Sequence, residues 1–137
     1  MVQVYFLLVA TNILSGVLLA RSGLKHPLSS DLEAFFSVLE KKWFLGGLGL
    51  LTFVTGFLGL LFVLPGDQIF LGDLIPSLTA LLAGTSLILE FYQKEMPEKT
   101  GNTKRLDDIL LNNRWIVGLL ATGFGILHFL APQVIFL

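Results

Sequence analysis

Among the polar or ionisable side chains in the long apolar stretches of this sequence, three are of types that could support chemistry. They are Asn12 in the first stretch, Glu90 near the end of the third and His128 in the last. A group of this kind inside an apolar environment is costly to bury and is therefore a functional hypothesis by default. Glu90 could couple to protons, His128 could relay a proton or ligate a cofactor, and Asn12 could contact a substrate.

Each of the three also has a simpler structural interpretation. Glu90 precedes Lys94 by four residues, which is the favourable order for an ion pair on one helix face. A neutral His128 can hydrogen-bond to a carbonyl group, and Asn12 can hydrogen-bond to a neighbouring helix. The sequence favours these structural interpretations, so no residue is assigned a catalytic role.

Cofactor and metal chemistry find little support in the sequence. The chain has no cysteine, and its second histidine, His26, lies in a loop, so a bis-histidine haem site is not expected. Asp107 and Asp108 are adjacent but lack further ligands for a metal. No phosphate-binding loop, nucleophile elbow or H-E-x-x-H run occurs. We therefore expect a protein that is not an enzyme and that binds no cofactor or metal.

Composition explains why such polar groups are few. Of 137 residues, 54% are hydrophobic and 14% are charged, and the mean hydropathy is +0.80. A soluble domain normally has about 25% charged residues, so a water-soluble monomer is excluded. The net charge of -1 also argues against a nucleic-acid partner. The lipid bilayer is thus the expected environment.

Four apolar segments are long enough, or nearly so, to cross a bilayer as helices. Such a crossing needs roughly 20 residues, and a helix satisfies the backbone groups that lipid cannot. The segments are 2–20, 43–65, about 74–89 with an extension toward Tyr92, and 115–137. The predicted fold is therefore an all-α integral membrane protein with four transmembrane helices in a single domain, 1–137.

The distribution of basic residues predicts the orientation. All nine Lys and Arg residues occur in the first and third connections, whereas the middle connection has none. Basic loops remain on the cytoplasmic side of a membrane, which places both termini on the other side. A bacterial inner membrane, a thylakoid membrane or an equivalent energy-transducing membrane fits this pattern. Because no basic residue precedes the first apolar segment, we expect that segment to be retained rather than cleaved.

The first basic connection contains an amphipathic segment. Ser30 and Glu33 have the spacing of a capping box, and apolar residues then recur at helical spacing up to Trp43. This pattern predicts a helix at the inner membrane interface before the second span. The helix either lies on the lipid surface with its apolar face down or packs against the bundle.

Two segments of the chain have similar sequences. Residues 55–65 read TGFLGLLFVLP and residues 122–132 read TGFGILHFLAP, so Gly56 corresponds to Gly123. We interpret this match as a tandem duplication of a two-helix hairpin, with repeat 1 at about 1–71 and repeat 2 at about 72–137. Two copies in the same orientation are expected to be related by a pseudo-two-fold axis along the membrane normal.

Glycine residues recur at spacings that bring membrane helices close together. Small residues four positions apart let two backbones approach and supply packing in lipid. The pattern predicts a tight bundle or an interface with a partner chain. The glycines expected to pack helices are Gly46, Gly49, Gly56, Gly59, Gly84, Gly118, Gly123 and Gly125.

The run GILHFLAP at 125–132 resembles a His-Phe-x-x-Pro element found in DoxX-like four-helix membrane proteins. The resemblance covers eight residues of one helix, and no function is carried over from it.

Two classes of function follow from these features. The first is a non-catalytic small polytopic membrane protein that serves as a structural, assembly or accessory subunit of a larger membrane complex or forms a homo-oligomer. The alternative is a small-solute or proton-coupled transporter or channel in which Asn12, Glu90 and His128 line the path. Their different depths favour the first class. An enzyme or a quinone-handling anchor that uses His128 is a weaker third hypothesis.

The topology can be tested by labelling, because the chain has no cysteine of its own. Single Lys25→Cys, Phe70→Cys and Thr100→Cys variants should react with a membrane-impermeant maleimide from the inner, outer and inner sides respectively. The reason is that Lys and Arg in short loops resist transfer across the membrane. The opposite labelling pattern would overturn the predicted orientation.

Overall fold

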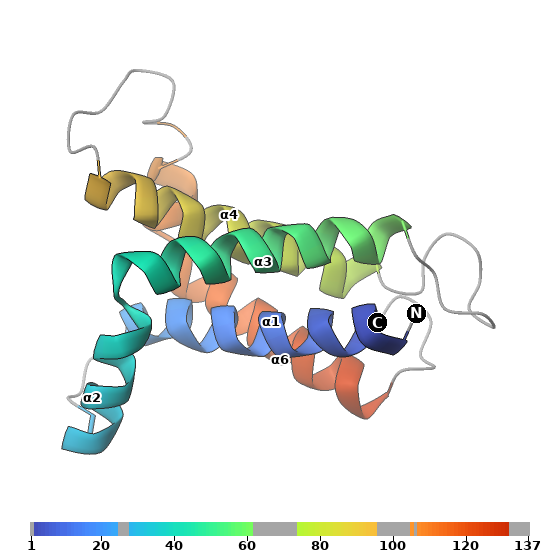
Figure 1. Ribbon diagram of the computed structural model, residues 1–137, viewed down its shortest axis with the longest axis horizontal. Coiled ribbons are helices and arrows are strands. Elements are labelled where there is room, and N and C mark those ends of the chain that lie inside the picture. The colour runs from blue at the N-terminus through green and yellow to red at the C-terminus, as the bar shows by residue number, and fades with distance from the viewer. Residues whose placement is uncertain (1, 25–27, 62–73, 96–104, 106, 132–137) are drawn as a thin grey trace.

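The computed structural model describes residues 2–24, 28–61, 74–95, 105 and 107–131, which contain helices and turns but no strand. Four long helices lie side by side, and a shorter helix, α2, projects from one end of the bundle (Figure 1). Pro65, Pro132 and His26 lie outside the described ranges. In chain order the elements are α1 (Val2–Ala20), a 3-10 turn (Arg21–Gly23), α2 (Ser30–Leu39), α3 (Lys42–Leu61), α4 (Leu74–Glu95), a short π-helical segment (Asp107–Leu111) and α6 (Arg114–Leu130).

Three of the described helices are long and apolar enough to cross a membrane. They cover 2–23, which includes the 3-10 turn, 42–61 and 74–95. The helix α6 is apolar as well, but it has 17 residues and is therefore about 25 Å long at 1.5 Å per residue. Length and composition thus identify three candidate spans in the described part of the chain.

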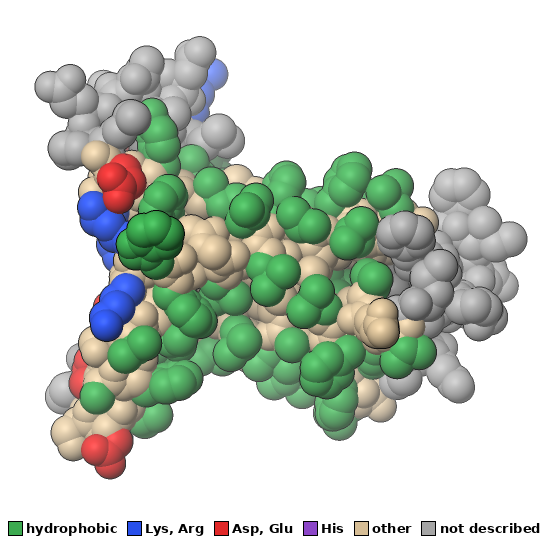
Figure 2. All heavy atoms as spheres, in the orientation of Figure 1, with side chains coloured by type: hydrophobic (Ala, Val, Ile, Leu, Met, Phe, Trp, Pro, Cys, Tyr) green, Lys and Arg blue, Asp and Glu red, His purple; other side chains and the backbone are tan. Residues whose placement is uncertain are grey.

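Charged side chains gather at one end of the bundle. α1 and α4 end there and α3 and α6 begin there, and every charged side chain that the structure describes lies at this end (Figure 1, Figure 2). Apolar side chains cover most of the remaining length of the bundle in Figure 2. A bilayer requires this separation, because a charged group is far costlier in the hydrocarbon layer than at its surface.

The four long helices form two close antiparallel pairs, α1 with α6 and α3 with α4. α1 also packs against α3, and α4 packs against α6 to a similar extent. α1 and α4 meet across the middle of the bundle, whereas α3 and α6 occupy opposite corners. Each pair therefore contributes one central helix and one outer helix.

Glycine residues allow both pairs to approach closely. In the pair α1–α6, a Cβ atom built on Gly16 would lie 2.8 Å from the carbonyl oxygen of Gly118. A Cβ atom built on Gly118 would overlap the backbone of Ala20. In the pair α3–α4, a Cβ atom on Gly84 would lie 2.9 Å from the carbonyl oxygen of Gly49. Atoms do not pack at such distances, so a larger residue at any of these positions must push the helices apart.

The two pairs use the same pattern of contacts. In the pair α1–α6, Gly16 contacts Gly118. In the pair α3–α4, Gly84 contacts Gly49. In each case the glycine of the central helix faces the carbonyl oxygen of a glycine on the outer helix. The contacts of one helix pair therefore correspond to those of the other.

The register of this correspondence differs from the alignment of residues 55–65 with 122–132. A Cβ atom on Gly56 would lie 2.9 Å from the Cβ atom of Ala80, whereas one on Gly123 would meet no atom of the described residues within 4 Å. The structural counterpart of Gly56 is Gly125, which packs against Asn12. A shift of two residues turns a helical position by about 200° to the opposite face. Of the two alternatives expected from sequence, Gly123 therefore does not take part in helix packing among the described residues, and its role at an interface with a partner chain remains a prediction.

The start of α2 also differs from the sequence prediction. The N-cap residue is Ser29 rather than Ser30, and its side chain makes no capping hydrogen bond. The carboxylate of Glu33 lies 2.5 Å from the guanidinium of Arg21 instead. Hydrogen bonds between charged groups are stronger than neutral ones, so Glu33 ties α2 to the end of α1 and does not complete a capping box.

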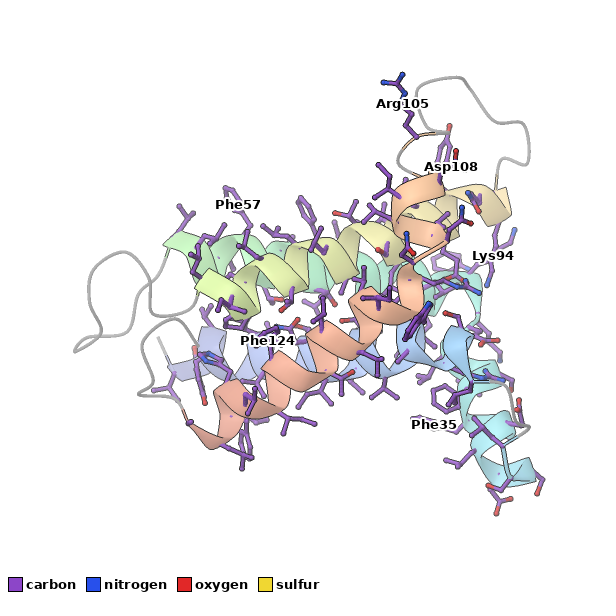
Figure 3. The ribbon with its side chains drawn as sticks, turned by 180° about the vertical axis from the view of Figure 1, so that it is seen from behind. Phe35, Phe57, Lys94, Arg105, Asp108 and Phe124 are labelled. Atoms are coloured by element: carbon purple, nitrogen blue, oxygen red, sulfur yellow. The ribbon has the colours of Figure 1, made fainter. Side chains whose placement is uncertain are left out.

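Two apolar faces of α2 have different surroundings. Phe36 and Leu39 are buried in the core, so one face packs against the bundle. Leu32 and Phe35 are about half exposed, and Phe35 points to the side on which the bundle extends (Figure 3). α2 thus packs one apolar face against the bundle, and its contact with a lipid surface stays a prediction for the other face.

The glycine contacts predict a sharp difference between two substitutions. Gly56→Leu should destabilise the fold by about 1 to 3 kcal/mol, the usual range for overpacking, because the new side chain would enter the contact between α3 and α4. Gly123→Leu is the matched control, because the same side chain meets open space there. Unfolding of both purified variants in SDS, followed by circular dichroism, measures the difference. Equal stabilities would show that the α3–α4 contact does not depend on Gly56.

Candidate functional site

A polar cluster near the middle of the bundle connects α1, α3 and α4. Asn12 is fully buried, and its Nδ2 atom donates a hydrogen bond of 2.8 Å to the carbonyl oxygen of Pro76. Its Oδ1 atom accepts a hydrogen bond from the Thr79 hydroxyl at 3.4 Å. The hydroxyl oxygens of Thr11 and Thr55 lie 2.9 Å apart and share a hydrogen bond. These bonds join three helices in an apolar environment, as polar residues commonly do in membrane bundles.

Most other buried hydroxyl groups are satisfied within their own helices. Ser15, Thr52 and Ser86 each donate to a carbonyl oxygen four residues earlier. Such bonds satisfy a hydroxyl group without a ligand or a neighbouring helix. Ser77 differs, because its buried Oγ atom has no hydrogen-bond partner among the described residues. The polar interior therefore consists mainly of groups that the chain itself satisfies.

His128 is fully buried on α6 and faces Tyr5 of α1. The two ring centres are 4.7 Å apart, and the Tyr5 hydroxyl donates a hydrogen bond of 2.7 Å to the carbonyl oxygen of His128. His128 follows Gly125 by about one helical turn, and Gly125 packs against Asn12. This contact fastens the end of α6 to the start of α1.

Glu90 lies at the charged end of the bundle. Its carboxylate is 3.5 Å from the Nζ atom of Lys94 and 3.3 Å from the Nη1 atom of Arg114, and its side chain is 19% exposed. The ion pair with Lys94 is the one that the four-residue spacing predicted. The bridge to Arg114 was not predicted, because it joins α4 to α6. Glu90 therefore holds two helices together at the charged end of the bundle.

A polar cavity of about 200 Å³ opens beside Glu90. Its charged lining consists of two cations and two carboxylates: Arg21, Arg114, Glu40 and Glu90. Arg21 forms an ion pair with Glu40 at 2.6 Å, and Arg114 forms one with Glu90 at 3.3 Å. Because these charges neutralise one another, the cavity has no excess charge that would select an ion.

The three candidate residues do not form one site. Asn12 and His128 share the interior, while Glu90 lies at the charged end. On α1, the buried side chains of Leu18 and Leu19 lie between Asn12 and that end. Within the described ranges, no group of three or more His, Asp or Glu side chains is arranged to hold a metal ion.

Arg21 is the residue whose role the sequence analysis missed. Its guanidinium pairs with Glu33 and Glu40 of the α2 segment and lies 4.8 Å from the ring centre of Phe36. The missed signal is the seven-residue spacing of the two glutamates, which places them on one face of a helix. Two carboxylates on one face, with a single arginine at the preceding helix end, indicate a shared ion pair.

A family model that carries no functional description matches residues 1–128. The chain belongs to this uncharacterised family. The matched range includes Asn12, Glu90 and His128, and therefore the interior of the bundle and its charged end. No curated protein and no solved structure matches the chain. Family membership thus assigns no activity, and the function is inferred from the geometry.

The polar cluster predicts a measurable contribution to stability. Asn12→Leu should destabilise the bundle by about 0.6 to 2 kcal/mol, the range found for polar contacts between membrane helices, because it removes the bonds to Pro76 and Thr79. Thr85→Val is the matched control, because the Thr85 hydroxyl donates only to Leu81 of its own helix. SDS unfolding of both variants gives the comparison. A loss of the same size in both would show that the cross-helix bonds of Asn12 add nothing.

Proposed function

We propose that this chain is a non-catalytic integral membrane protein with four transmembrane helices, which serves as a structural or accessory subunit and binds another membrane chain or a second copy of itself. Two features support a structural role. The interior polar groups are mainly satisfied by the chain itself, and the close glycine contacts hold the bundle together without a ligand. The surroundings of this proposed subunit are the lipid bilayer and its partner chain.

Four crossings are supported by the packing of α6. This helix runs antiparallel along α1, from Gly118 beside Ala20 to His128 beside Tyr5. Because α1 is long enough to span a membrane, a helix paired with it over this length crosses the same layer. The segregation of basic residues supports cytoplasmic loops at the charged end and termini on the opposite side.

Duplication of a helix hairpin is supported by the matching contacts of the two pairs. The sequences TNILSG at 11–16 and TALLAG at 79–84 share Thr, Leu and Gly at equivalent positions. The sequence GLL likewise recurs at 49–51 and 118–120. These matches agree with the register of the glycine contacts, and they relate the two hairpins by a pseudo-two-fold axis.

The observation that carries the proposed function is the open glycine of α6. Among the described residues, no atom lies within 4 Å of a Cβ atom built on Gly123, and an apolar hollow of about 220 Å³ surrounds it. The hollow is lined by Leu119, Leu120, Gly123, Phe124 and Leu127. A glycine with large apolar neighbours lets a second helix approach closely in lipid. We infer that this surface receives a transmembrane helix of the partner.

A small-solute transporter or channel is the second candidate. The cavity beside Glu90 favours it, because a polar entrance at the membrane boundary is what such a protein needs. Against it stand the leucines Leu18 and Leu19, which lie between this cavity and Asn12. The hydrogen bonds of Asn12 are also satisfied within the bundle. The structural role therefore accounts for more of the described residues.

Purification of the tagged protein from its native membrane in mild detergent tests the proposal. The protein should be recovered with a fixed ratio of a partner chain or as an oligomer, and Gly123→Leu should reduce that recovery without unfolding the bundle. Val54→Leu is the control, because Val54 is exposed on α3 and lies outside the linings of both surface hollows. Recovery of a monomer alone, or recovery unaffected by Gly123→Leu, would contradict the proposal.

The purified protein, reconstituted into liposomes, also distinguishes the structural role from the transporter. In liposomes with a pH gradient, the structural subunit should show no solute flux. A proton-coupled transporter should show flux that Glu90→Gln abolishes, because the amide cannot titrate. For the structural role, Glu90→Gln should cost only about 0 to 1 kcal/mol, as expected for an ion pair at an interface. Flux that depends on Glu90 and survives Gly123→Leu would establish the transporter.

A further inference from the structure

A groove lies on the surface of the α3–α4 pair at the charged end of the bundle. Its volume is about 510 Å³, within the range of about 300 to 1,000 Å³ that is typical of ligand sites. Its lining is mainly apolar, but a cation and a carboxylate lie at its edge: Lys42, where α3 begins, and Glu95, where α4 ends. The groove is therefore amphipathic and lies where a membrane-spanning helix meets the polar boundary.

The floor of the groove is shaped by two glycines. A Cβ atom built on Gly47 would meet no atom of the described residues within 4 Å, and one built on Gly46 would lie 3.2 Å from the ring of Phe91. Leu50 and Ile88 complete the apolar lining on the two helices. A narrow slot between large apolar side chains suits a hydrocarbon chain, which gains dispersion contacts there without losing hydrogen bonds.

Trp43 forms one wall of the groove. Its side chain is 94% exposed, although it adjoins Gly46 and Gly47 in the lining. Tryptophan favours the membrane interface, where its apolar ring contacts lipid and its N–H group remains near polar atoms. Its position supports an occupant with an apolar chain below and a polar group above.

The charges at the rim define the polar group. The Nζ atom of Lys42 lies 3.0 Å from the Oε1 atom of Glu95, and both side chains are about half exposed. An exposed ion pair of this kind is weak, so its members can exchange partners at little cost. A headgroup that carries a phosphate and an ammonium could pair its phosphate with Lys42 and its ammonium with Glu95.

We propose that this groove binds a membrane phospholipid with an ethanolamine headgroup, with one acyl chain over Gly47 and against Trp43. A headgroup that carries only negative charge offers no cation to the Glu95 carboxylate, which would then lie close to the phosphate that Lys42 binds. A choline headgroup carries no N–H donor for the Glu95 carboxylate, whereas a primary ammonium carries three. The ethanolamine headgroup is thus the one that satisfies both members of the rim pair.

Fluorescence quenching of Trp43 tests the proposal. In a Trp115→Phe background Trp43 is the sole tryptophan, and lipids with brominated chains quench it on contact. The full-length protein is placed in choline-lipid vesicles that contain a small fraction of brominated ethanolamine, glycerol or choline phospholipid. The brominated ethanolamine lipid should associate about two- to fivefold more strongly than the other two, as expected for one exposed ion pair. Equal quenching by all three would overturn the proposal.

Two substitutions locate the effect within the groove. Gly47→Phe should abolish the headgroup preference by filling the slot. Leu82→Phe, at an exposed position of α4 outside the lining of the groove, should retain it. Glu95→Gln should reduce the preference for ethanolamine over glycerol lipid without filling the groove. If Gly47→Phe fails to fold, Glu95→Gln alone tests whether the groove binds the lipid.

A preference that survives both Gly47→Phe and Glu95→Gln would refute the site. A dimer that Gly47→Phe converts to a monomer, with no headgroup preference, would assign the groove to a second copy of the chain instead.

Discussion

Close backbone contact between antiparallel helices is the interaction on which the rest of this structure depends. Lipid chains are as apolar as leucine side chains, so the hydrophobic effect does not drive helices together inside a bilayer. Dispersion contacts between closely spaced backbones must replace it, and Gly16 against Gly118 and Gly84 against Gly49 provide that spacing. Because hydrogen bonds act only over short distances, the bonds of Asn12 to α4 also require the helices to be this close.

Polar interactions then fix the bundle at two depths. In the interior, Asn12 joins α1 to α4 and Thr11 shares a hydrogen bond with Thr55 of α3. At the charged end, Glu90 joins α4 to α6 and Arg21 ties α2 to α1. The interior bonds gain from the absence of competing water, whereas the ion pairs lie where charges can still be hydrated. The same end carries the groove beside Trp43, so the polar boundary organises both the packing and the proposed lipid site.

The candidate residues were predictable from sequence to different degrees. Asn12, Glu90 and His128 were identifiable because a polar residue is rare inside an apolar segment. The ion pair of Glu90 with Lys94 followed from their spacing on one helix, whereas its bridge to Arg114 did not, because it depends on how α4 and α6 meet. Gly123 shows the same limit, since a match in sequence did not reveal on which face of α6 it lies.

The sequence by itself determined that the chain is helical and apolar and that its basic residues lie in two of three connections. Composition and segment length suffice for these properties, because they depend on each residue and its neighbours along the chain. Only the tertiary structure decided which face of each helix points inward, and hence that Gly56 and Gly125 pack while Gly123 and Gly47 are open. The physical reason is that lipid and protein interior are both apolar, so a membrane helix need not alternate polar and apolar faces as a soluble helix does.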